Sequence, residues 1–252
     1  MLKTVDYDGR QHAVYAQGRA LPAKSITTWM RVFSAHAPAS RPLTVLDLGS
    51  GTGRFTPALA ETFGGPVYGV EPSANMRREA QTGATHPGVH YLAGQAEDIP
   101  LSAESCDLVL MYLSFHHVRD RAPAAREIRR VLRPGGRVLI RSTFADRMPD
   151  ADWHRYFPAA REIELQMFPT VGAVQALFAE VGLATVALET VETERAASLA
   201  DYAALLRFKA ISVFEHISEA DIARGFEDLD AAVLADRTPG PILAREDLLV
   251  LG

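Results

Sequence analysis

The apolar positions along the chain switch repeatedly between two spacings, one typical of helices and one typical of strands. Ile26, Trp29, Met30 and Phe33 follow one another at helical spacing, which predicts a helix over residues 23–37. Short runs of apolar and β-branched residues predict strands, and glycine or proline punctuates the segments between them. The five strands predicted in the first part of the chain cover residues 43–47, 67–70, 89–93, 106–111 and 137–142.

Helices are predicted between these strands, over residues 54–63, 73–80 and 122–132. The segment 106–111 reads Cys-Asp-Leu-Val-Leu-Met with little alternation, as expected of a strand that is buried on both faces. Strand and helix alternate in a way that favours a parallel sheet with helices on both faces. We therefore expect an α/β fold built on a doubly wound sheet.

The length of 252 residues predicts a single domain, which we divide into segments. These are an N-terminal helical segment (1–42), an alternating core (43–142), two helical insertions (146–170 and 198–236), a helix over 171–180, and strands over 183–191 and 247–251. The first insertion carries Trp153, Tyr156, Phe157 and Phe168. These rings either close over an apolar or aromatic ligand or pack the insertion onto the sheet.

Composition narrows the class of protein. Apolar residues make up 48% of the chain, enough for a sizeable core. The formal charge of −5 disfavours a general nucleic-acid-binding protein, because such proteins are usually basic. The lone cysteine, Cys106, excludes an internal disulfide bond and a Cys-x-x-Cys metal site. No signal peptide and no membrane-spanning apolar run is visible, so we expect a cytoplasmic protein with no membrane partner.

The clearest chemical signal is Val-Leu-Asp-Leu-Gly-Ser-Gly-Thr-Gly over residues 45–53. Gly49, Gly51 and Gly53 follow a predicted strand, where they allow positive φ and a close approach of a ligand to the backbone. In open α/β sheets, ligands bind at the carboxyl ends of the strands. The spacing is not the Gly-x-Gly-x-x-Gly of dinucleotide-binding proteins, and Asp47 would repel a pyrophosphate. The loop therefore predicts a site for a cationic ligand rather than for NAD.

Further candidates follow the next two predicted strands. Glu71 ends the second strand, 18 residues after Gly53, where a carboxylate can accept both hydroxyls of a ribose. Gln95, Ala96 and Glu97 come after the third strand, where the edge of an adenine can be read. These positions predict a nucleoside-containing ligand.

His116 and His117 follow the fourth predicted strand. The pair either acts on the substrate, as a base or a contact, or packs against the following helix. No carboxylate or thiol lies at a supporting spacing, so we expect no metal site.

In this order the motifs resemble the class I S-adenosylmethionine-dependent methyltransferases, in particular their small-molecule branch. The resemblance covers about residues 12–142. It implies a Rossmann-like sheet of seven strands that ends in a hairpin with one antiparallel strand, capped by helical insertions. It also implies S-adenosylmethionine as the cofactor. The cofactor-binding positions that it implies are Tyr15, Arg19, Asp47, Gly49, Ser50, Gly51, Gly53, Glu71, Pro72, Met76, Gln95, Ala96, Glu97 and Met111.

The resemblance also assigns roles at the methionine end of the cofactor. Tyr15 and Arg19 look like the pair that holds the methionine carboxylate, and Arg19 suits a planar carboxylate through its two-pronged guanidinium. Asp47 and the three glycines would line the methionine and ribose portions. Met111 would lie near the sulfonium.

At the nucleoside end, Glu71 would bind the ribose hydroxyls and Met76 would pack on the adenine. Gln95 stands where many relatives have aspartate. Its amide oxygen can still accept a hydrogen bond from the adenine amino group.

The implied reaction is the in-line transfer of a methyl group to an oxygen, nitrogen or carbon atom of a small molecule, apolar or aromatic in character. The alternatives are a tRNA or protein methyltransferase, which a basic cleft over the cofactor would favour, and a non-catalytic cofactor-binding protein. The acidic segment 198–236 is expected to be a solvated helical face, with a homodimer surface or a second part of a lid as alternatives.

Overall fold

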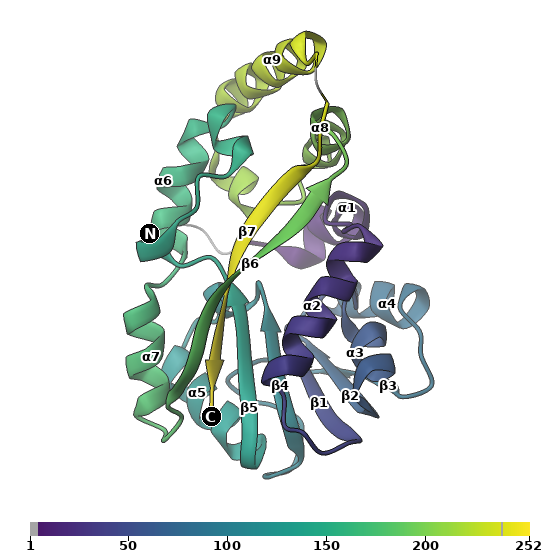
Figure 1. The fold of residues 1–252 in the computed structure, drawn as a ribbon, viewed down its shortest axis with the longest axis vertical. Coiled ribbons are helices and arrows are strands. Elements are labelled where there is room, and N and C mark those ends of the chain that lie inside the picture. The colour runs from purple at the N-terminus through teal and green to yellow at the C-terminus, as the bar shows by residue number, and fades with distance from the viewer. Residues whose placement is uncertain (1–4, 238) are drawn as a thin grey trace.

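The computed structural model describes residues 5–237 and 239–252, which form a seven-stranded sheet with helices on both faces (Figure 1). Residues 1–4 of the predicted N-terminal segment lie outside the described part of the chain. The strand order is β3-β2-β1-β4-β5-β7-β6. The strands are β1 (Leu43–Leu48), β2 (Gly64–Glu71), β3 (Val89–Ala93), β4 (Cys106–Tyr112), β5 (Leu132–Ser142), β6 (Thr185–Ala196) and β7 (Ile242–Leu251).

The first five strands are parallel, and β7 is antiparallel to both of its neighbours, β5 and β6. The predicted doubly wound sheet with one antiparallel strand in its final hairpin is therefore confirmed. The chain winds outward from β1 in one direction and from β4 in the other, so the carboxyl ends of these two neighbours form the switch point where such sheets bind ligands.

Helices cover both faces of the sheet because each presents one apolar side to it. The helices of the chain are α1 (His12–Gly18), α2 (Ala23–His36), α3 (Thr56–Phe63), α4 (Ala74–Gly83), α5 (Arg121–Val131), α6 (Pro158–Met167), α7 (Val171–Ala179), α8 (Leu199–Arg207) and α9 (Glu219–Ala235). The buried side chains of α2 and α3 pack on one face, and those of α5 and α7 pack on the other. Trp29 and Phe33 of the predicted α2 face are fully buried.

The two insertions form a cap above the carboxyl end of the sheet. Figure 1 shows α6, α8 and α9 gathered there, around the far ends of β6 and β7. Trp153 and Phe157 of the first insertion pack against Phe214 of the second, with ring centroids 5.5 and 5.1 Å apart. These rings therefore join the two insertions to each other rather than to the sheet.

The main differences from the predicted elements lie at strand ends. β6 runs to Ala196 and β7 begins at Ile242, because the two strands pair with each other well beyond the last residues that pair with β5. Side chains alternate between exposed and buried along this extension, so its apolar signal is weak in the sequence. Among the described helices, none combines the length and the apolar character that a membrane crossing requires.

Candidate active site

The glycine loop lies at the switch point, directly after β1. Gly49, Gly51 and Gly53 all have positive φ, between 57° and 78°. A β-carbon at Gly49 would collide with Ser114 in the loop after β4, and one at Gly53 would collide with Tyr91. At Gly51 the only neighbour within 4 Å is the ring of Tyr15, at 3.9 Å. Gly49 and Gly53 thus allow the loop to pack closely against its neighbours, whereas open space lies in front of Gly51.

Two buried carboxylates flank this loop. Asp47 accepts a hydrogen bond from Thr56 Oγ1 at 2.7 Å, and burial raises its pKa to about 6. Glu71 accepts from the backbone N–H groups of Gly51 and Ser73, each at 2.9 Å. Burial raises the pKa of Glu71 as well. The loop backbone and the end of β2 are therefore tied together by one carboxylate.

The N-terminal segment closes over the same edge of the sheet. The Asp8 carboxylate accepts hydrogen bonds from Ser73 Oγ and from the N–H of Asn75, at the start of α4. The Arg54 guanidinium donates to the Arg19 carbonyl at 2.6 Å, which holds the end of α1 beside the glycine loop. Tyr15 and Arg19 thereby lie next to residues 52–54.

A cavity of about 740 Å³ opens between this edge of the sheet and the cap. Of the predicted site residues, Tyr15, Arg19, His116 and His117 line it. The cap contributes Trp153, Glu164 and Phe168 to its wall, and the β6–β7 hairpin contributes further residues. The cavity is therefore built by segments that lie far apart in the sequence.

His116 and His117 lie side by side at this cavity, with ring centroids 3.9 Å apart. His117 Nε2 is 2.7 Å from the hydroxyl oxygen of Tyr7, and the His116 ring lies against Phe168 at 4.3 Å. Burial lowers the pKa of His117 to about 4 and the pKa of His116 well below its usual value. Both rings are neutral at pH 7. Among residues 5–237 and 239–252, no group of three His, Cys, Asp or Glu side chains is placed to hold a metal ion.

The other predicted cofactor positions do not line the cavity, neither those at the nucleoside end nor Met111, Asp47 and the glycine loop. Met76 and Met111 are buried, the latter among core residues of the sheet, and Gln95 and Pro72 are exposed. The Glu97 carboxylate accepts from the backbone N–H groups of Arg119 and Asp120, just before α5. Its side chain therefore anchors the loop after β4. Ala96, next to it, is buried.

Sequence reasoning missed much of the cavity wall, including its residues Tyr7, Arg54, Arg141 and Arg195. A signal for Arg141 was available, because it stands in the otherwise apolar stretch Val-Leu-Ile-Arg of a predicted buried strand, and buried arginines are rare without a role. Arg54 directly follows the glycine-loop motif, whereas Tyr7 and Arg195 lie in segments with no motif, and only the fold brings the four together.

Comparisons with known proteins agree with this geometry. A family model described as a methyltransferase domain matches residues 46–140. An uncharacterised methyltransferase of Geobacillus kaustophilus is 30% identical over 147 residues, which are 55% of this chain and 67% of that protein. The O-methyltransferase resE of Aspergillus sclerotiorum is 33% identical over 159 residues, which are 60% of this chain and 59% of that protein.

Solved structures show the same architecture. The crystal structure of a putative methyltransferase from an antibiotic biosynthesis pathway of Anabaena variabilis superposes with a TM-score of 0.71 and 23% identity. The superposition covers 92% of this chain and 99% of that one, so the likeness extends over the cap as well as the sheet. The glycine loop and its two flanking carboxylates agree with what these relatives show, namely that the chain belongs to the class I S-adenosylmethionine-dependent methyltransferases.

Proposed function

We propose that this protein transfers the methyl group of S-adenosylmethionine to an oxygen, nitrogen or carbon atom of a small molecule held in the cavity under the cap. The observation that carries the proposal is the cavity itself. Arg54, which directly follows the glycine loop, lines it together with Tyr15 and Arg19. Its volume of about 740 Å³ is within the roughly 300–1,000 Å³ typical of small-molecule sites. Residues of both insertions line it, among them Trp153 and Phe168 of the first and Tyr202 and Val213 of the second.

The residues around the glycine loop fit the cofactor chemically. Ser50 Oγ is buried and has no hydrogen-bond partner among the described residues, so the loop holds an unused polar group. The open space in front of Gly51 allows a ligand to reach the backbone. Asp47 and Glu71 suit the positively charged and hydroxyl-bearing parts of the cofactor, and Arg19 suits its carboxylate. We assign the methionine and ribose portions to these residues.

The bound cofactor supplies an electrophilic methyl group on a sulfonium sulfur. The chain's task is to hold the acceptor atom in line with that methyl group, and orientation of this kind can supply roughly 7–11 kcal/mol of a reaction barrier. His116 and His117 are neutral acceptors at the cavity wall, but their lowered pKa values make them weak bases. We therefore assign them to positioning of the acceptor rather than to proton removal.

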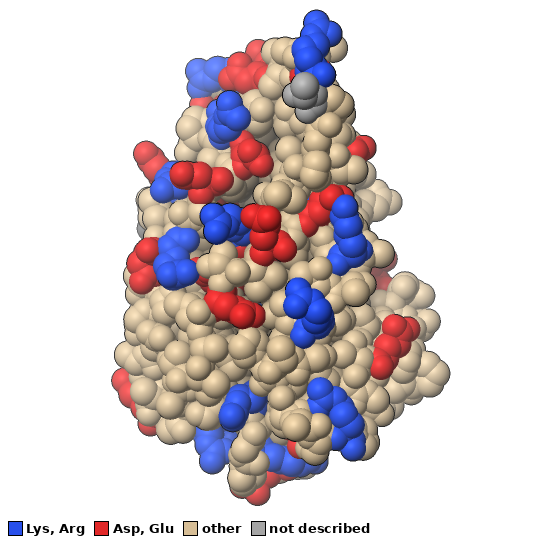
Figure 2. All heavy atoms as spheres, in the orientation of Figure 1, with Lys and Arg blue, Asp and Glu red and all other residues tan. Residues whose placement is uncertain are grey.

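A tRNA or protein substrate is the second candidate, and it is less well supported. On the face shown in Figure 2, acidic and basic side chains are interspersed over the cap and the upper part of the sheet. A nucleic-acid surface would need a continuous basic stripe there. We further propose that residues 146–170 and 198–236 act as substrate-specificity elements, with residues 43–142 as the cofactor-binding core.

Calorimetric titration with S-adenosylmethionine, S-adenosylhomocysteine and NAD tests the proposal. We expect micromolar binding of the first two and no binding of NAD, because Asp47 opposes a pyrophosphate. Binding of the cofactor without turnover of any small molecule would favour the non-catalytic alternative. Absence of binding would overturn the assignment of the loop.

A further inference from the structure

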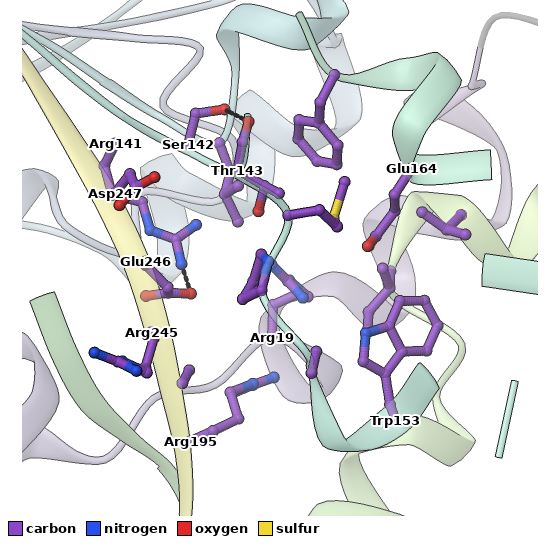
Figure 3. A pocket seen from close by; sticks show the side chains of 18 of the residues that line it. Arg19, Arg141, Ser142, Thr143, Trp153, Glu164, Arg195, Arg245, Glu246 and Asp247 are labelled. Atoms are coloured by element: carbon purple, nitrogen blue, oxygen red, sulfur yellow. Dashed lines mark hydrogen bonds and ion pairs between the residues drawn. The ribbon is translucent and has the colours of Figure 1, made fainter. Parts of the chain in front are cut away.

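Four arginine side chains converge on one wall of the cavity. Arg19 follows α1, Arg54 follows the glycine loop, Arg141 is near the end of β5 and Arg195 is near the end of β6. Figure 3 shows Arg19, Arg141 and Arg195 around one side of the cavity, with Trp153 and Glu164 on the opposite side. Like charges gathered in this way repel one another unless a negative group lies among them.

Within the described residues, the cluster has one carboxylate partner. Arg141 pairs with Glu246 through Nη2, and its side chain is only 2% exposed. Its Nε and Nη1 atoms are buried and have no hydrogen-bond partner among the described residues. Arg195 donates to the carbonyls of Gly18 and Ala20, which are neutral groups. A buried guanidinium with two unused donors is costly to leave unsatisfied.

The remaining acidic residues of the wall are mostly committed elsewhere. Asp247 binds Arg147, and Glu164 lies 2.8 Å from His154. Asp146 accepts from the N–H of Val171, Asp150 pairs with Arg161, and Glu192 lies 4.0 Å from Arg245. Asp152, the last of them, stands beside Trp153 across the cavity. Counted against Glu246, its one ion-pair partner, the cluster of four arginines keeps a surplus of positive charge.

The titration behaviour of the cluster agrees with this surplus. Burial lowers the pKa of Arg141 to about 9, and Arg19, Arg54 and Arg195 add to the effect by repulsion. Burial likewise lowers the pKa of Arg195 to about 10, again with repulsion from Arg19 and Arg54. Both groups would be stabilised by an anion placed between them.

The cofactor does not neutralise this cluster. Its one carboxylate, which we assign to Arg19, comes with an ammonium and a sulfonium group, so its net charge is positive. Arg195 and the two unused donors of Arg141 are therefore left for another anion.

We propose that the methyl acceptor is an organic anion whose carboxylate or phosphate group binds between Arg141 and Arg195. The proposal rests on the proposed function and names its substrate class. The apolar body of the acceptor would extend toward Trp153 and Phe168 on the cap side of the cavity. The fork-shaped guanidinium donors suit either oxyanion through paired hydrogen bonds.

The test uses protein saturated with S-adenosylhomocysteine, whose own binding is measured first. Phenylacetate, phenyl phosphate and the neutral isostere phenylacetamide are then titrated by calorimetry. We expect at least one anion to bind about tenfold or more tightly than phenylacetamide, and the tighter of the two anions identifies the head group. Arg195→Gln should remove about tenfold or more of that affinity while binding of S-adenosylhomocysteine stays unchanged.

Arg245→Gln is the matched control, since Arg245 lies on the same cavity but is 71% exposed and faces Glu192. It should leave anion binding unchanged. Arg141→Gln is a second variant, with its fold checked by circular dichroism. Equal binding of acid and amide, no binding of either anion, or equal losses in the Arg195 and Arg245 variants would overturn the proposal. Failure of the wild type to bind S-adenosylhomocysteine would instead overturn the proposed function, and the anion titration is then read on the free protein.

Discussion

At the residue scale, Glu71 is the side chain on which the cofactor assignment depends most directly. It is 7% exposed, and its two oxygens already accept backbone hydrogen bonds from Gly51 and Ser73. A carboxylate held in this way is pre-positioned to accept hydroxyl groups from the same side. We expect Glu71→Ala to weaken binding of S-adenosylmethionine by more than about 1 kcal/mol, because a buried acceptor is lost.

Calorimetry checks this prediction, with Glu79→Ala as the control, since Glu79 is exposed on the neighbouring helix α4. Unchanged affinity in the Glu71 variant would refute the ribose assignment.

A substitution at His116 distinguishes between two roles of this side chain, positioning of the acceptor and removal of a proton. Its pKa is lowered well below the usual value, first by burial and then by His117. We expect His116→Ala to reduce turnover by less than about 100-fold, the lower end of what a general base contributes. Steady-state kinetics with the acceptor identified in a screen give the measurement. A larger loss at unchanged cofactor affinity would make His116 a base.

The lowered pKa of His117 makes the free energy of unfolding depend on pH. Its folded pKa of about 4 lies below the ordinary 6.5, mainly through burial and then through repulsion from His216. The unfolded chain therefore binds a proton between pH 6.5 and 4 that the folded chain does not, and stability falls as the pH falls through this window. Between pH 7.5 and 5 the loss due to His117 is about 2 kcal/mol.

Urea unfolding at the two pH values measures this loss in the wild type and in His117→Gln, whose amide can still bond to Tyr7. We expect the drop in the free energy of unfolding to be smaller in the variant. An equal drop would mean that His117 is not desolvated as the structure places it.

At the scale of elements, the glycine loop shows how one motif combines two roles. Gly53 and Gly51 both have positive φ, which costs a residue with a β-carbon about 1–2 kcal/mol. Gly53→Ala adds a collision with Tyr91, whereas Gly51→Ala meets only open space and the Tyr15 ring. We expect Gly53→Ala to lower the melting temperature more than Gly51→Ala does. For Gly51→Ala we expect the loss in free energy of cofactor binding to exceed the loss in free energy of unfolding.

Thermal unfolding and calorimetry on the two variants give both quantities. The same loss of stability in both variants would show that the positive φ alone, and not the packing against Tyr91, excludes alanine from this loop.

At the scale of the whole molecule, the cap depends on contact between two insertions that are distant in sequence. Gly225 of α9 lies against the ring of Phe157, so that a β-carbon there would collide with it. Gly172 of α7 has no neighbour within 4 Å of the same position. Alanine is favoured over glycine in a helix by about 1 kcal/mol, which makes the pair a matched test.

We expect Gly172→Ala to stabilise the protein slightly and Gly225→Ala to destabilise it, with loss of acceptor turnover but not of cofactor binding. Melting curves and calorimetry provide the comparison. Stabilisation by both substitutions would show that the two insertions are not packed as described.

Much of the fold was accessible from local patterns. The pattern of apolar residues identified α2, the edge strand β3 and the buried strand β4 to within a residue or two. The helix predicted over residues 73–80 is α4, and the hydroxyl of Ser73 caps it by accepting from the N–H of Met76. Local patterns succeed here because helix caps and strand periodicity depend on neighbours a few residues away. The extent of the β6–β7 hairpin was missed, because its outer part is polar and neither strand alone carries a pattern that indicates pairing with the other.

The sequence by itself determined the class of sheet, the position of the glycine loop and the carboxylates that flank it, because these depend on residue type and short spacing. Only the tertiary structure decided which residues line the cavity. Arg141 and Arg195 are 54 positions apart, and the Tyr7 hydroxyl meets His117 across 110 positions. Such meetings depend on how the N-terminal segment, the insertions and the hairpin fold back over one edge of the sheet, and no local pattern carries that information.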